Sequence, residues 1–222
     1  MILAAGLGSR LRPLTNTLPK PLIPVLGKPL IVYHLENLAR AGFKEIVINV
    51  CYLGNKIQSF IGNGSAWNLT IEYSVEPQDE PLETGGGLVK ALPLLQNEPF
   101  ITVNADIFTD FDFSHFHSFS AQENILAHLV LIPSTPKNDF NWDNTTGLLS
   151  NPSGVSSQGL TVSGITWYHP NFFKDLTPGR YSITPYWRKY ADERKLSGEI
   201  FTGNWSDVGT IEVLQALNSE SR

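Results

Sequence analysis

The chain of 222 residues has a single cysteine, Cys51, and therefore cannot form an intramolecular disulfide. Cys51 lies in an apolar run of the kind that forms buried strands, which argues against a reactive thiol. No apolar run approaches the roughly 18 residues of a membrane span, and the first residues do not have the basic-then-apolar pattern of a signal peptide. We expect a cytoplasmic protein that does not associate with membranes.

The chain also lacks an excess of basic residues. Its net charge of -5 argues against a nucleic-acid surface, which needs Lys and Arg to neutralise phosphates. The charge is unevenly distributed, because residues 1–44 carry six basic side chains against one acid, Glu36, so this segment is +5 and the remainder is -10. The six are Arg10, Arg12, Lys20, Lys28, Arg40 and Lys44. A cationic segment in an acidic protein suits a small polyanionic ligand.

Several common catalytic signatures are missing. The sequence contains no Gly-x-Ser-x-Gly element of the serine hydrolases. Gly27-Lys28 is followed by Pro29, which excludes a Walker loop, and Leu11 replaces the third glycine of the dinucleotide fingerprint. His115 and His117 have no cysteine or third histidine nearby, so a zinc site is not indicated.

Hydrophobic periodicity predicts the fold. Strand-like runs alternate with helical patterns in the first part of the chain, which is typical of βαβ units and a parallel sheet. We therefore predict an α/β fold, a Rossmann-like three-layer sandwich with a mostly parallel central sheet, in one domain over residues 1–222. The expected strands are 2–5, 45–50, 70–75, 100–105, 125–132 and 160–168, and the expected helices are 30–41, 83–95 and 211–217. Regular alternation ends near residue 133.

A glycine-rich turn follows directly after the first expected strand. Gly6 and Gly8 lie where the carboxyl end of a parallel strand would present backbone N–H groups to a phosphate. Arg10 comes next, and Lys20 lies between two prolines that restrict its backbone. These cations and glycines predict a phosphate-binding site.

The stretches Leu-Ala-Ala-Gly-x-Gly-x-Arg at 3–10, Pro-Leu-Thr at 13–15 and Pro-Lys-Pro-Leu at 19–22 together resemble the opening signature of the sugar-1-phosphate nucleotidyltransferases. The resemblance covers essentially the whole chain. It implies that Arg10 and Lys20 are catalytic, with Lys20 on the α-phosphate. It also implies a nucleotide-binding half at about 1–133 and a sugar-binding, closing half at about 134–222. The nucleotide-binding residues that it implies are Ala5, Gly6, Gly8, Ser9, Arg10, Lys20, Glu76, Gly85 and Gly86.

Two aspartates complete the implied site. Asp106 follows the expected strand 100–105, and Asp207 lies in a Trp-x-Asp-x-Gly-Thr element of the kind with which the family supplies a second metal-binding carboxylate. The resemblance thus implies Mg²⁺ held by Asp106 and Asp207, a coordination that suits this ion. The implied reaction is attack by a sugar phosphate on the α-phosphorus of a nucleoside triphosphate, with release of pyrophosphate.

Further stretches bear on the substrates. Residues 80–87, 90–95, 163–165, 169–170 and 196–199 resemble the family members that act in bacterial cell-wall recycling, which implies UTP and N-acetylmuramic acid α-1-phosphate as substrates. The sugar-binding residues would be Asn104, Asp139, Gly164 and Glu199. Alternatives are mannose 1-phosphate with GTP, another hexose 1-phosphate, and a non-catalytic nucleotide-sugar sensor. Since no further domain is indicated, we expect a monomer.

Overall fold

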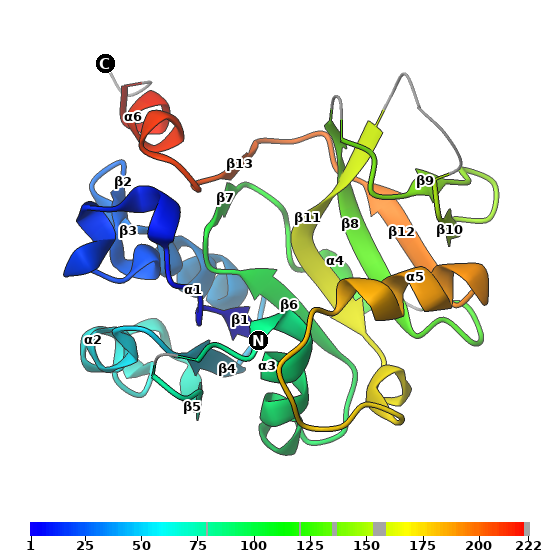
Figure 1. Cartoon of the computed structure of the whole chain (residues 1–222), viewed down its shortest axis with the longest axis horizontal. Coiled ribbons are helices and arrows are strands. Elements are labelled where there is room, and N and C mark those ends of the chain that lie inside the picture. The colour runs from blue at the N-terminus through cyan, green and yellow to red at the C-terminus, as the bar shows by residue number, and fades with distance from the viewer. Residues whose placement is uncertain (79, 120, 135–136, 153–158, 220–222) are drawn as a thin grey trace.

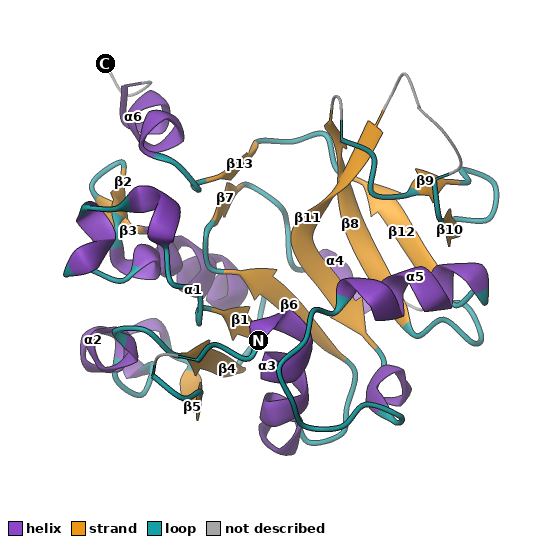
Figure 2. Cartoon of the chain, in the orientation of Figure 1, coloured by secondary structure: helices purple, strands orange, loops and turns teal. Residues whose placement is uncertain are grey.

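A computed structural model describes residues 1–78, 80–119, 121–134, 137–152 and 159–219. Its centre is a seven-stranded sheet in the order β12-β8-β11-β6-β1-β4-β5 (Figures 1 and 2). The strands are β1 Ile2–Leu3, β4 Glu45–Val50, β5 Thr70–Val75, β6 Phe100–Asn104, β8 Ala127–Ser134, β11 Gly159–Tyr168 and β12 Leu196–Ile200. Only β11 runs antiparallel to its two neighbours in this sheet. The prediction of a mostly parallel sheet is confirmed.

Helices cover both faces of the sheet, which confirms the three-layer sandwich. The helices α1 Leu30–Arg40, α2 Gly54–Ile61 and α4 His115–Ser118 contribute buried side chains to one apolar core. The helices α3 Glu83–Ala91 and α5 Thr184–Asp192 contribute to a second core on the opposite face. In Figure 2, α3 and α5 lie in front of the strands, and α1 lies behind them.

A third, smaller core joins the two ends of the chain. The helix α6 Ile211–Ser219 places Leu214 beside Leu11 and Val25, and Val208 is buried among them. Val25 belongs to the short hairpin of β2 Pro24–Val25 and β3 Lys28–Pro29. Burial of these side chains holds the glycine-rich turn against the C-terminal segment. The contact brings residues that are about 200 positions apart into one region (Figure 1).

Two expected boundaries are corrected by local chemistry. The helix expected over 83–95 ends at Ala91 and continues as a 3₁₀ turn, Leu92–Leu94. Pro93 lacks an N–H group and its ring clashes with the preceding turn, so the α-helix cannot continue through it. The strand expected over 2–5 is short, Ile2–Leu3, and the backbone after it opens into the glycine-rich turn.

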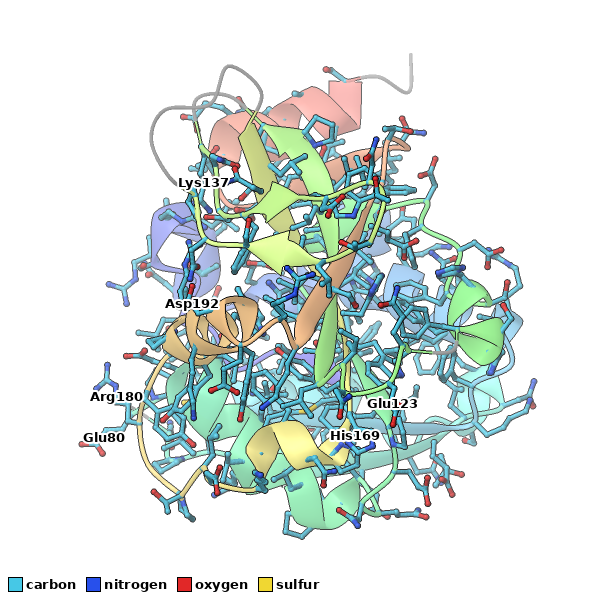
Figure 3. The ribbon with its side chains drawn as sticks, turned by 90° about the vertical axis from the view of Figure 1, so that its right-hand side faces the viewer. Glu80, Glu123, Lys137, His169, Arg180 and Asp192 are labelled. Atoms are coloured by element: carbon cyan, nitrogen blue, oxygen red, sulfur yellow. The ribbon has the colours of Figure 1, made fainter. Side chains whose placement is uncertain are left out.

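Several regular elements were not predicted from periodicity. Among them are α5, β12 and the short strands β7 Ile107–Thr109, β9 Asn141–Trp142, β10 Leu149–Ser150 and β13 Trp205–Asp207. Charged side chains such as Glu80, Glu123 and Arg180 lie on the exterior (Figure 3). None of the helices in the described part of the chain has the length and apolar character that crossing a bilayer requires.

Candidate active site

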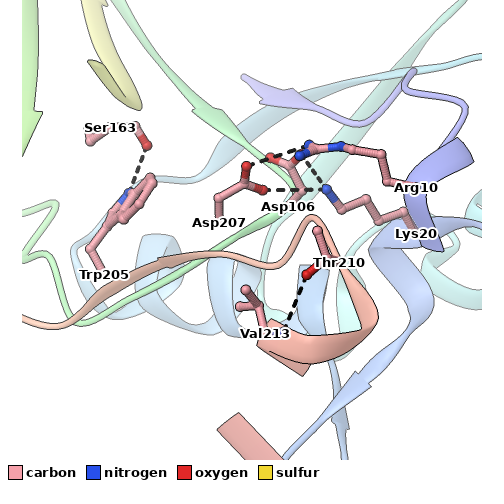
Figure 4. Close-up of polar contacts among 8 residues, drawn as sticks. All are labelled: Arg10, Lys20, Asp106, Ser163, Trp205, Asp207, Thr210 and Val213. Carbon is pink, nitrogen blue, oxygen red and sulfur yellow. Dashed lines mark hydrogen bonds and ion pairs between the residues drawn. The ribbon is translucent and has the colours of Figure 1, made fainter. Parts of the chain in front are cut away.

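Four charged side chains from distant segments meet at the carboxyl edge of β1 and β6 (Figure 4). The Nζ of Lys20 lies 2.6 Å from Asp106 Oδ2 and 3.6 Å from Asp207 Oδ1. A guanidinium nitrogen of Arg10 lies 3.6 Å from Asp207 Oδ2. The two predicted catalytic cations and the two predicted metal ligands therefore share one site.

Strand pairing explains why the two aspartates meet. Asp106 directly follows β6, and β7 begins at the next residue. Because β13 pairs antiparallel with β7, Asp207 lies opposite Ile107, and the N–H of Val208 donates to the carbonyl of Asp106 at 2.9 Å. The C-terminal segment is thus held beside the end of β6 by backbone hydrogen bonds, and its carboxylate is placed next to Asp106.

Lys20 is almost completely buried, with a side-chain exposure of 10%. It begins a short 3₁₀ turn, Lys20–Leu22, with Pro19 in extended conformation before it and Pro21 inside the turn. An ammonium group in such surroundings needs opposite charge, and the two aspartates supply it. The lysine therefore has a fixed position at the bottom of the site.

The donor set fits a magnesium ion. Two carboxylates converge on one point, and Asp207 Oδ1 is buried without a hydrogen-bond partner. Within the described residues no group of three or more His, Cys, Asp or Glu side chains forms a metal cage. Mg²⁺ typically takes one or two protein carboxylates and fills its remaining positions with water and substrate phosphate, so two aspartates are sufficient.

A cavity of about 220 Å³ opens beside these charges. Six of the predicted site residues line it, namely Ala5, Gly6, Lys20, Glu76, Asn104 and Asp106. Its other lining residues are Leu3, Ala4, Pro21, Asn49, Pro81, Glu83, Thr84 and Ala105. All of the lining lies between Leu3 and Asp106, within the half at about 1–133 that is expected to hold the nucleotide.

Glu76 closes one wall of this cavity through a buried hydrogen-bond relay. Its carboxylate accepts from Asn49 Nδ2 and from the backbone N–H of Leu82, each at 2.7 Å. The other end of the Asn49 amide accepts from the N–H of Ala4 at 2.9 Å. The relay connects three segments of the cavity wall, and Glu76 acts through it as a support for the loop that leads into α3.

Glu76→Ala should lower the free energy of unfolding by about 2 kcal/mol, because it leaves buried N–H donors of Asn49 and Leu82 without an acceptor. Urea denaturation followed by circular dichroism measures this loss. Glu72→Ala is the matched control in β5, the strand that ends just before Glu76, because Glu72 is exposed and its loss should change the stability little. Equal stability of the two variants would contradict the role given to the relay.

The glycine-rich turn has the geometry of a compact loop. Gly8 has φ +63°, in the left-handed region that glycine adopts most readily, and a Cβ there would lie 2.9 Å from a methyl carbon of Thr15. The Thr15 hydroxyl donates to the Gly8 carbonyl at 2.8 Å. A Cβ at Gly6, in contrast, would meet no atom within 4 Å. Gly6 therefore faces open space, as a loop that receives a ligand requires.

Gly85 and Gly86 are buried at the start of α3, and the segment 179–181 packs directly on them. A Cβ on Gly85 would lie 2.6 Å from the ring of Tyr181, and both N–H groups donate to the Tyr181 carbonyl. The family resemblance implies that these two glycines bind the nucleotide. The structure adds another reason for them, the close packing of this second segment.

Two further cavities continue on the side of β11. One shares Asn104 with the first cavity, includes Gly164, and is lined largely by hydroxyl and aromatic groups: Thr84, Thr102, Thr166, Tyr168, Ser182, Thr184 and Trp187. The other includes Asp207, Thr161 and the exposed Lys137 (Figure 3). Uncharged hydrogen-bonding groups beside a cation suit a phosphorylated sugar.

Asp139, predicted to contact the sugar, does not line any of these cavities. Its carboxylate accepts from the Thr161 hydroxyl and the Val162 N–H and lies 3.2 Å from Lys137 Nζ. Burial raises the pKa of this carboxyl, but these hydrogen bonds and the nearby ammonium outweigh it, so the pKa lies below its ordinary value. In this structure the carboxylate connects β11 to the segment between β8 and β9.

Glu199, the fourth predicted sugar residue, also lies apart from the three cavities. One of its carboxylate oxygens lies 3.2 Å from His115 Nε2 and 3.6 Å from His128 Nε2. This places it between β8, β12 and α4. Ser9 and Arg10 do not line these three cavities either. The guanidinium group of Arg10 lies beside the carboxylate of Asp207.

Comparison with known proteins agrees with this geometry. A sequence profile of the family described as "Nucleotidyl transferase" matches residues 1–222. An N-acetylmuramate alpha-1-phosphate uridylyltransferase of Neisseria meningitidis serogroup B is 45% identical over 95% of this chain and 93% of its own. One with the same name from Caulobacter vibrioides is 30% identical over 94% and 90%. A mannose-1-phosphate guanyltransferase of Hypocrea jecorina is 41% identical, over 54% of this chain and 33% of its own.

Solved structures share the fold. A Bacillus anthracis protein assigned as a glucose-1-phosphate thymidylyltransferase superposes with a TM-score of 0.85, 24% identity, and coverage of 100% of this chain and 94% of its own. A UDP-glucose pyrophosphorylase in complex with UDP-glucose superposes with a TM-score of 0.79 at 20% identity, over 99% and 96%. With the family profile and the near full-length relatives, these findings show that the chain belongs to the nucleotidyl transferase family and is a sugar-1-phosphate nucleotidyltransferase.

Proposed function

We propose that this enzyme transfers the uridylyl group of UTP to N-acetylmuramic acid α-1-phosphate and releases pyrophosphate. The observation that carries the reaction type is the convergence of Lys20 and Arg10 on Asp106 and Asp207. The substrate assignment is supported by the two uridylyltransferase relatives that align over nearly the whole chain. The proposed setting is cell-wall recycling by a cytoplasmic monomer.

The cavity lined by residues of the first half would receive the nucleotide, with its base beside Pro81, Glu83 and Thr84 and its phosphates toward Lys20. The cavities on the β11 side, which include Asn104 and Gly164, would receive the sugar. In this proposal the half at about 1–133 binds the nucleotide, and the sugar lies between the half at about 134–222 and residues such as Asn104 of the first half. Asp207 returns to the site from the second half and would close it.

No general base is required for the proposed transfer. The second pKa of a phosphate monoester is about 6, so the attacking phosphate is already largely a dianion at neutral pH. An oxygen of that phosphate forms a bond to the α-phosphorus of UTP, and the bond from this phosphorus to the bridging oxygen of the leaving pyrophosphate breaks. The obstacle is repulsion between two polyanions, which Lys20 and Arg10 are placed to reduce.

Asp106 and Asp207 would hold the magnesium ion, which when bound neutralises phosphate charge and orients the reacting oxygens. The protein's own contribution is the position of the charges around it. Lys20 Nζ lies 2.6 Å from Asp106 and 3.6 Å from Asp207, so its ammonium would lie within reach of a phosphate bound to an ion that both aspartates hold. A fixed cation at that point stabilises the negative charge that builds on the α-phosphoryl oxygens during transfer.

A second candidate within the same class is guanylyl transfer to mannose 1-phosphate. The observation that favours it is the 41% identity to the guanyltransferase of Hypocrea jecorina, although that match covers 122 residues. The match covers 54% of this chain and 33% of the guanyltransferase, whereas the two uridylyltransferases match over nearly the whole chain. A non-catalytic sensor is disfavoured, because nothing in ligand binding alone calls for all four of the charged groups at the site.

A substrate panel tests the proposal directly. Purified protein with Mg²⁺ should release pyrophosphate fastest from UTP with N-acetylmuramic acid α-1-phosphate, and at least about tenfold more slowly when GTP or mannose 1-phosphate replaces the matching substrate. Coupled phosphate detection measures every pair of four nucleotides and several sugar phosphates. Fastest release with GTP and mannose 1-phosphate would support the second candidate, and binding without release for every pair would support a sensor.

A further inference from the structure

Gly209 lies two residues after Asp207, at the turn between β13 and α6. The N–H of Gly209 donates to the Asp207 carbonyl at 2.7 Å. The carbonyl of the next residue, Thr210, accepts a hydrogen bond from the N–H of Leu214 in α6. Its φ angle lies outside the left-handed region, so the backbone at this position does not itself demand glycine. The reason for a missing side chain must lie in what surrounds it.

The surroundings are the guanidinium group of Arg10. A Cβ built on Gly209 would lie 2.8 Å from each terminal nitrogen of Arg10 and 2.9 Å from Cζ. Nearly equal distances to three atoms of a planar group mean that the Cβ would point into the flat face of the guanidinium. Arg10 therefore lies flat over the Gly209 backbone, with one nitrogen 3.6 Å from Asp207 Oδ2.

We infer that Gly209 is a positioning residue for Arg10, an inference that rests on the proposed role of Arg10 in stabilising phosphate charge. The side chain of Arg10 is 63% exposed, and its ion pair with Asp207 is loose, at 3.6 Å. An exposed arginine has many rotamers, so a flat surface of backbone at Gly209 narrows the range that the guanidinium samples. A methyl group there would lift the guanidinium from this surface and away from Asp207.

The structure also predicts that this displacement costs the fold little. The three atoms nearest to the new Cβ all belong to the far end of a flexible, largely exposed side chain, that of Arg10. Arg10 can move, whereas the backbone of Gly209 keeps an ordinary conformation. Gly209→Ala should therefore leave the thermal unfolding midpoint within about 2 °C of the wild type, because it removes no packed core group.

A double-mutant cycle tests the inference, with turnover measured by pyrophosphate release. We expect Gly209→Ala to lower kcat roughly 10- to 100-fold, the effect of displacing a catalytic group by about 1 Å. In the Arg10→Ala background the same substitution should have no more than about a twofold effect, since the group that it displaces is absent. In an Arg10→Lys background, Gly209→Ala should likewise change kcat little, because lysine has no planar guanidinium group for the new methyl group to displace. Gly179→Ala is the matched control, as its Cβ would come no closer than 3.5 Å to any neighbour.

The outcomes separate this inference from the proposed function. If Arg10→Ala lowers turnover and Gly209→Ala does not, the positioning role is wrong and the proposed function stands. An equal loss from Gly209→Ala in the wild-type and Arg10→Ala backgrounds would also overturn it, because the glycine would then act through something other than Arg10. If Arg10→Ala itself leaves turnover unchanged, the role proposed for Arg10 fails, and this inference fails with it.

Discussion

Lys20→Ala is expected to lower kcat by a factor of roughly 10² to 10³ while the protein stays folded, which is the size of effect seen when one group that stabilises transition-state charge is removed. The buried ammonium of Lys20 lies 2.6 Å from Asp106 Oδ2, at the point where the α-phosphate is proposed to lie. Steady-state release of pyrophosphate at saturating UTP and sugar phosphate measures the loss.

Lys28→Ala serves as the control for this variant. Lys28 lies on the short hairpin next to α1, where it pairs with Glu36 and lies over the ring of Tyr33. The substitution therefore removes one positive charge from the basic segment, as Lys20→Ala does, but away from the site. Its turnover should stay close to that of the wild type. A similar loss for both lysines would mean that the overall charge of residues 1–44 matters and that the position of Lys20 does not.

Asp106→Asn is expected to lower kcat by at least roughly 10²-fold, with circular dichroism and the unfolding midpoint close to those of the wild type. The amide keeps the size of the side chain but removes the charge that balances Lys20 and that would hold the divalent ion. Asp175→Asn makes the same chemical change at an exposed position and should have no effect. Full turnover in Asp106→Asn would remove this carboxylate from the proposed mechanism.

The charged centre of the site could be predicted because its residues stand in short, dense motifs. Lys20 between two prolines and Asp106 at the end of an apolar run each carry a local signal. Asp207, far along the chain, was assigned through the family resemblance, from its Trp-x-Asp-x-Gly-Thr element. No local pattern in the sequence indicated why Asp106 and Asp207 lie side by side. That reason is the pairing of β13 with β7, two short strands of three residues each whose periodicity is too brief to detect.

The rest of the site depends on tertiary contacts that no local pattern reports. Asn49 lines the nucleotide cavity through a relay with Glu76 and Ala4, residues from three different segments. Glu83 adopts φ +59°, a conformation that is uncommon for a residue with a side chain, and nothing in its neighbours along the sequence indicates it. Asp139 was assigned to the sugar by resemblance alone, and its carboxylate engages groups of β11 instead, so its predicted role stays untested.

The central proposition is that Asp106 and Asp207 together hold one divalent ion beside the triphosphate. Electron paramagnetic resonance of Mn²⁺ in the presence of UTP tests it without relying on turnover. The wild type should bind one Mn²⁺ per chain in the ternary complex, and Asp106→Asn and Asp207→Asn should each weaken that binding by at least about tenfold. Unchanged Mn²⁺ binding in both variants would contradict the account.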